Sequence, residues 1–101
     1  MITRIWHGWT TPENADAYEE LLRSNLFPKI ADRQIEGYEG AHLLRRDSNQ
    51  GVEFITLLWF ETFEAVKAFA REASTLAEAR QLLVTSDPLP QHYRVIPQDE
   101  Q

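Results

Sequence analysis

Cysteine is absent from this 101-residue chain, and glycine and basic residues are scarce. Without cysteine there is no disulfide, no thiolate nucleophile and no Cys-ligated metal. The four glycines are scattered, so none of them builds a phosphate-binding loop. Ten basic residues against sixteen acidic ones give a net charge of −6. Because no basic excess is available to neutralise phosphate, we expect neither a nucleic-acid nor a membrane partner.

Long apolar runs are also missing. None approaches the roughly 18 residues of a membrane span, and the N-terminus lacks the basic region, apolar core and cleavage site of a signal peptide. A cytoplasmic location is therefore the expectation. The length and the 43% hydrophobic content are typical of one domain. We expect that domain to cover residues 1–96, with 97–101 as a polar C-terminal tail.

The stretch 52–60 organises the rest of the chain. It contains no glycine or proline and is rich in β-branched and aromatic residues, which predicts a buried strand. Both of its alternating sets of side chains are mainly apolar, so both faces of the strand need cover. The stretch 1–10 has the same property, with His7 and Trp9 on one face and Trp6 on the other.

The remaining elements follow from local signals. Thr11-Pro12 marks a helix start and Thr62 caps a second helix, while the segment 47–51 is dense in turn formers. The expected elements are a strand over 1–10, a helix from Pro12 that breaks or kinks at Phe27 before a short turn to Asp32, strands over 38–46 and 52–60, a helix after Thr62, a further helical segment through Leu76, Ala79, Leu82 and Leu83, and a strand over 92–96.

This order is β-α-β-β-α-β, the ferredoxin-like α+β arrangement. It places two helical layers on one face of a four-stranded antiparallel sheet and leaves the other face bare. An apolar sheet face of that size exceeds the few hundred Å² that monomers usually expose. We therefore predict a homodimer formed through the sheet face, with a mainly apolar interface.

Catalytic and metal motifs are weak. No serine is framed by a nucleophile elbow, and no His-x-x-x-His or carboxylate cluster suggests a metal. The three histidines, His7, His42 and His92, fall on separate predicted strands. A dispersed three-histidine metal site is geometrically possible, but we expect no metal.

His7, between two tryptophans, allows two interpretations. It is either a core histidine satisfied by a backbone carbonyl or water, or an orienting donor or base in a flat aromatic pocket. Tyr93 is likewise either part of an edge pair with a wet polar tip or a phenol donor at a pocket. A register slip of one residue would exchange His7 for Trp6 at any such site.

Several segments resemble small members of the antibiotic biosynthesis monooxygenase family, across residues 2–96. They are 5–10 (Ile-Trp-His-Gly-Trp-Thr), 17–22, 37–40 (Gly-Tyr-Glu-Gly), 52–60 and His92-Tyr93. The resemblance implies a dimeric α+β barrel with a pocket between each sheet and its own helices. Characterised relatives oxidise quinols and polycyclic anthrones with O2 and no cofactor, others degrade haem, and some isomerise or merely bind.

By this resemblance we expect a cofactor-independent monooxygenase acting on a quinol-like or polycyclic aromatic molecule. His7 would orient or deprotonate a phenolic oxygen and Tyr93 would donate a hydrogen bond. Further substrate-binding candidates are Trp9 and Trp59, as ring walls, with His42 and His92.

The alternative is a non-catalytic dimeric binding or stress-linked module that holds an aromatic metabolite. Haem binding is less expected. The haem-degrading relatives use an asparagine on the first strand together with a tryptophan and a histidine on helices. Here His7 takes the strand position, and no histidine lies between residues 43 and 91.

Overall fold

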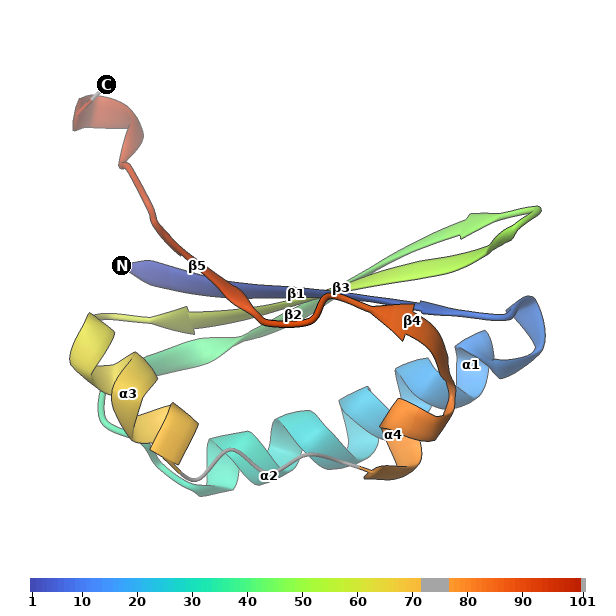
Figure 1. The fold of residues 1–101 in the computed structure, drawn as a ribbon. Coiled ribbons are helices and arrows are strands. Elements are labelled where there is room, and N and C mark those ends of the chain that lie inside the picture. Colours follow the sequence, from blue (N-terminus) through green and yellow to red (C-terminus); the bar gives the residue numbers. More distant parts are fainter. Residues whose placement is uncertain (72–76, 101) are drawn as a thin grey trace.

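The computed structural model describes residues 1–71 and 77–100. Its elements are β1 (Ile2–Thr10), α1 (Pro12–Leu21), η1 (Leu22–Leu26), α2 (Phe27–Asp32), β2 (Tyr38–Ser48), β3 (Gly51–Phe60), α3 (Phe63–Arg71), α4 (Ala77–Gln81), β4 (Leu83–Ser86), β5 (Gln91–Arg94) and a 3-10 turn, η2 (Gln98–Glu100). All four labelled helices lie on one side of the sheet (Figure 1). The predicted ferredoxin-like α+β architecture is confirmed.

The sheet has five strands, not the predicted four. Its order is β2-β3-β1, and the outer edge of β1 is shared by β4 and β5. All pairings are antiparallel: β4 pairs with the end of β1, from Gly8 to Thr10, and β5 pairs with its beginning, from Ile2 to Ile5. The strand expected over 92–96 is β5, and β4 is an additional strand that was not predicted. Pro88 and Pro90 lie between β4 and β5 and lack the N–H that a continuous ladder needs.

The helical segment expected through Leu82 and Leu83 is wrong at its end. Helix α4 stops at Gln81, and Leu83 opens β4, opposite Thr10. Leu83 also packs over Gly8, where an added Cβ would lie 2.9 Å from the Leu83 Cδ2. Pairing with the free edge of β1 outweighs the helical spacing of the leucines. The predicted interruption at 74–75 and Leu76 lie outside the described residues.

The helix starts follow the predicted caps. The Thr11 hydroxyl accepts from the Asn14 N–H at 3.3 Å, and the Thr62 hydroxyl accepts from the Ala65 N–H at 3.2 Å. The break expected at Phe27 takes the form of a π turn, η1, in which the Phe27 N–H reaches the Leu22 carbonyl. The short turn expected from there to Asp32 is wrong, since this stretch is helix α2. Because proline has no N–H to donate, the widened turn carries the chain into α2 without a full stop.

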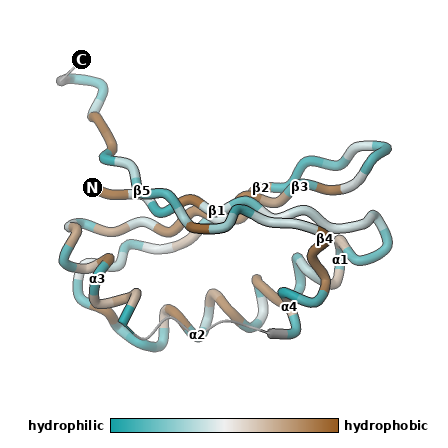
Figure 2. Tube along the Cα trace, in the orientation of Figure 1, coloured by the Kyte–Doolittle hydropathy of each residue, from teal (hydrophilic) through white to brown (hydrophobic). Residues whose placement is uncertain are grey.

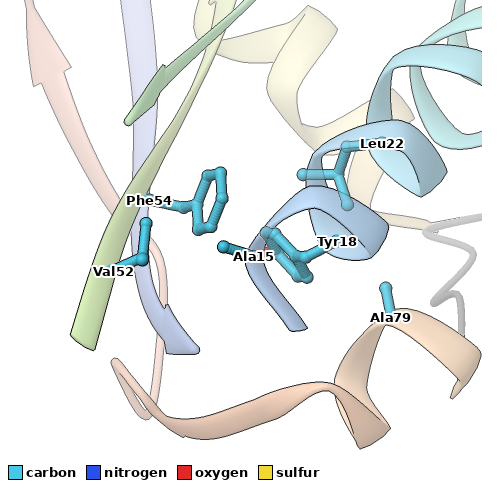
Figure 3. Packing of buried hydrophobic residues seen from close by; sticks show 6 residues of the cluster. All are labelled: Ala15, Tyr18, Leu22, Val52, Phe54 and Ala79. Atoms are coloured by element: carbon cyan, nitrogen blue, oxygen red, sulfur yellow. The ribbon is translucent and has the colours of Figure 1, made fainter. Parts of the chain in front are cut away.

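The core lies wholly between the sheet and the helices. Phe54 of β3 points towards Tyr18 of α1, and Val52 and Ala79 belong to the same cluster (Figure 3). A second cluster surrounds Phe60 beneath α3. Apolar positions nevertheless recur along the strands as well as along the helices (Figure 2). One face of the sheet therefore forms the core while the other carries apolar residues without a helix above it.

Truncating Phe54 tests how much the first cluster contributes to the stability of the fold. Its ring is 0% exposed and lies 4.8 Å from the Tyr18 ring, so Phe54→Ala should lower the free energy of unfolding by about 3–5 kcal/mol. Urea denaturation measures the change. Leu89→Ala, at a site that is 68% exposed, is the control and should change it by less than about 0.5 kcal/mol. Equal effects of the two substitutions would contradict the assigned core.

Candidate functional site

The register of β1 against β3 decides which side chains share a face. Residues directly opposite in an antiparallel pair point to the same side. Gly8 lies opposite the core residue Phe54, and Trp6 lies opposite Thr56. The even-numbered residues of β1 therefore face the helices, and the odd-numbered ones, with His7 and Trp9, face away.

We call the helix-free side of the sheet the open face. Its residues, read from the strand pairings, are Thr3, Ile5, His7 and Trp9 on β1, Glu53, Ile55, Leu57 and Trp59 on β3, Gly40, His42, Leu44 and Arg46 on β2, Thr85 on β4, and Gln91 and Tyr93 on β5. His7 and Trp9 share a face as predicted. The pocket expected between the sheet and its own helices is not where they lie, because their parity turns them outward.

His7 is held by Asp87, which is not among the predicted site residues. The Asp87 carboxylate lies 2.7 Å from His7 Nδ1 and also accepts from the His7 backbone N–H at 3.0 Å. The imidazole stacks on the Trp9 indole, with ring centroids 5.9 Å apart and planes 15° from parallel. These contacts fix both the position and the plane of the ring.

The pair has a defined protonation pattern. The hydrogen bond from His7 holds the pKa of Asp87 below its usual range, so the carboxylate is ionised near neutral pH and only accepts. The nitrogen facing it, Nδ1, must then carry the proton. In the neutral imidazole this leaves the lone pair on Nε2, which is the arrangement of a general base oriented by a carboxylate.

Asp87 occupies the gap between β4 and β5. Its N–H donates to the His7 carbonyl at 2.9 Å, and its own carbonyl accepts from the Trp6 indole N–H at 3.0 Å. It therefore bonds a residue on each face of β1. In the sequence, the only local sign of this role is that Asp87 directly precedes Pro-Leu-Pro. Its partner lies 80 positions away, so local spacing gave no means of pairing the two.

Two hollows flank the stacked pair. One, of about 370 Å³, is lined by Leu44, Arg45, Arg46, Glu53 and Ile55. It adjoins His7, because Ile55 is the β3 partner of His7. The other, of about 530 Å³, is lined by Trp9, Thr10, Thr11, Pro12, Gln50, Gly51, Val84 and Thr85. The Trp9 side chain thus lines a hollow with space for a ligand and stacks on His7.

Trp59 and His42 form a separate pair on the open face. The Trp59 indole N–H donates to His42 Nδ1 at 2.9 Å, with the rings edge to face. Thr3, the β1 partner of Trp59, is four residues from His7, which is about 13 Å along a strand. Trp59 and Trp9 consequently do not wall the same ring within one chain.

Tyr93 and His92 lie on opposite sides of β5. Tyr93 pairs with Thr3 on the open face and is 54% exposed, so it is also remote from His7. His92 pairs with Arg4 and lies on the helix side. The structure therefore brings His7 and Trp9 together, adds Asp87, and separates the other predicted site residues from them.

The described residues contain neither a metal-binding group nor a helix able to span a membrane. Within 1–71 and 77–100 no group of three or more His, Asp or Glu side chains is arranged to hold a metal ion. All three histidines lie on strands, β1, β2 and β5. None of the described helices combines the length and apolar character needed to cross a bilayer.

Comparisons with solved structures identify the fold. The chain matches a putative antibiotic biosynthesis monooxygenase from Bacillus cereus with a TM-score of 0.65 and 14% identity, over 93% of this chain and 91% of that one. A counterpart from Nitrosomonas europaea gives 0.63 and 14%, over 91% and 86%. The haem degrader MhuD from Mycobacterium tuberculosis, solved with two haems in its active site, gives 0.58 and 20%, over 96% and 97%.

No family model and no curated protein matches the sequence. The structural likenesses confirm, at the level of the fold, the resemblance drawn from the sequence. At 14–20% identity they carry the architecture alone, since one fold hosts many functions.

Replacing Asp87 should change the acid stability of the protein. Because folding lowers the pKa of Asp87, its stabilising contribution is present above the unfolded value of about 3.9 and is lost as pH falls through the lower folded value. Asp87→Asn should therefore lose less stability than the wild type on acidification, measured by urea denaturation from pH 7 to pH 3. Asp99→Asn, in the C-terminal turn, should keep the wild-type slope. Identical slopes for the wild type and Asp87→Asn would contradict the assigned pair.

Proposed function

We propose that the protein is a cofactor-independent monooxygenase for a quinol-like or polycyclic aromatic substrate, with His7 as the base. The observation that carries this is the His7 Nδ1–Asp87 hydrogen bond on the open face, beside the Trp9 indole. A neutral imidazole held in this tautomer has its Nε2 lone pair free for a phenolic proton. The shared fold with the two bacterial proteins named above supports the reaction class.

The chemistry needs only a base, an aromatic wall and O2. Nε2 takes the proton of the hydroxyarene, and the resulting anion is electron-rich enough to reduce O2 directly. One oxygen atom forms a bond to a ring carbon and the other leaves as water, the substrate supplying both hydrogens and both electrons. The Trp9 indole would hold the ring plane, and Asp87 would stabilise the imidazolium that forms.

The proposal includes a second copy of the chain over the open face. His7 and Asp87 side chains are still 33% and 29% exposed, whereas charge-separating proton transfer is favoured in a dry site. Large apolar side chains such as Leu44, 47% exposed, lie on the same face. A partner sheet packed there would dry the His7 site and bury those side chains, and the family that this fold resembles is typically dimeric.

Oxygen uptake tests the reaction. Purified metal-free and flavin-free protein should consume O2 with members of a panel of naphthohydroquinones and anthrones. His7→Gln should lower kcat at least about 100-fold, the usual effect of removing a general base. Asp87→Asn should lower it less and should displace the pH profile of kcat.

The control is Asp99→Asn, in the C-terminal turn, and it should keep the wild-type rate. Product formation followed by mass spectrometry distinguishes oxidation from binding. Thermal stabilisation by these compounds without O2 uptake would contradict the proposed enzyme and indicate a non-catalytic aromatic-binding module.

Light scattering tests the dimer. Leu57→Arg introduces a charge at the middle of the open face, and an unpaired charge in an apolar interface is strongly destabilising. The wild type should have the mass of two chains at micromolar concentration, and Leu57→Arg the mass of one. Leu89→Arg, at a site 68% exposed, should remain dimeric. A wild type that is monomeric at 100 μM would contradict the proposed assembly.

A further inference from the structure

Arg4 lies on the helix side of β1, opposite in direction to the His7 site. It sits between Leu58 of β3 and His92 of β5 in the strand pairing, with its guanidinium 5.0 Å from the centre of the Phe69 ring of α3. Leu58 and Phe69 are only 5% and 6% exposed. One flank of this cation therefore contacts core hydrocarbon.

The charge of Arg4 has no acidic partner within residues 1–71 and 77–100. Its hydrogen-bonded neighbour is the His92 ring, with 3.0 Å between an Arg4 terminal nitrogen and His92 Nε2. By contrast, Arg23, Arg45, Arg46 and Lys67 each lie within 4 Å of a carboxylate. Burial lowers the pKa of Arg4, a sign that its positive charge is only partly solvated.

His92 complements the guanidinium. Arginine only donates, so Nε2 of His92 must accept, and the proton of the neutral ring resides on Nδ1. Partial burial, and then the positive charge of Arg4, lower the pKa of His92, which keeps the ring neutral near pH 7. Nδ1–H is thus a second donor near the guanidinium.

A half-exposed aromatic ring lies next to this pair. The Phe63 ring of α3 is 6.0 Å from the His92 ring, edge to face, and Phe63 is 50% exposed. Lys67 lies above the same ring at 5.6 Å and pairs with Glu64. The half-exposed Phe63 ring therefore neighbours the His92 imidazole, which in turn neighbours the Arg4 guanidinium.

We propose that Arg4, His92 and Phe63 form a binding site for an aromatic carboxylate. The carboxylate would accept from the Arg4 guanidinium and supply the negative charge that the described residues do not. Hydrogen bonds to a charged group in a partly desolvated site are stronger than neutral ones. The ligand ring would pack on Phe63, which is 50% exposed. This site is on the opposite face of the sheet from His7 and does not depend on the proposed oxygenase activity.

Benzoate and its neutral isostere benzamide are the probes, titrated calorimetrically into the full chain at matched ionic strength. Benzoate should bind and benzamide should bind at least about tenfold more weakly, because a hydrogen bond to a charged group is worth more than one to a neutral group. Arg4→Gln should weaken benzoate binding by a similar factor. Arg46→Gln, which removes an equal charge from the open face, should leave it unchanged.

Phe63→Ala provides a second variant, since truncation at a half-exposed position on α3 should leave the chain folded. It should weaken benzoate several-fold while leaving stability near that of the wild type. Benzoate should also shift the side-chain NMR signals of His92 and leave those of His7 in place. Equal affinity for benzoate and benzamide, binding of inorganic phosphate as tight as that of benzoate, or unchanged binding in Arg4→Gln would each overturn the proposal.

Discussion

The antiparallel register between β1 and β3 is the constraint on which the other features depend. Opposite residues share a face, so placing Gly8 against Phe54 settles the direction of every β1 side chain at once. A shift of one residue would send His7 into the core and Trp6 outward. Gly8 supports this register locally, because Leu83 fills the space that a side chain would need. Two chemically different surfaces result from one strand.

The two surfaces are connected through the edge of β1. Proline residues interrupt the outer strand there, and the freed segment places Asp87 where it bonds His7 on one face and Trp6 on the other. Continuing the β4 register, in which Gly8 lies opposite Ser86, would also place Asp87 opposite His7. At the interruption the Asp87 carbonyl accepts instead from the Trp6 indole, and its carboxylate accepts from the His7 N–H.

The single helical layer divides the possible roles of the molecule. Helices α1 to α4 all cover the same side (Figure 1). Arg4 and His92 therefore contact phenylalanines of α3, whereas His7 and Trp9 lie on the open face, which no helix covers. A partly solvated base is weak until water is excluded. The reaction proposed for His7 and the second copy proposed above it are therefore linked by one physical requirement.

Much of the architecture was predictable from the sequence, because strand composition, helix caps and turn formers act over a few residues. The β-α-β-β-α-β order, the caps at Thr11 and Thr62 and the shared face of His7 and Trp9 all came from local periodicity. Only the tertiary structure decided that Leu83 extends a sheet and that Asp87 meets His7. It also decided that His92 belongs with Arg4 and not with the open face. These outcomes depend on which strand edge is free and on contacts between residues about 80 positions apart, which no local pattern records.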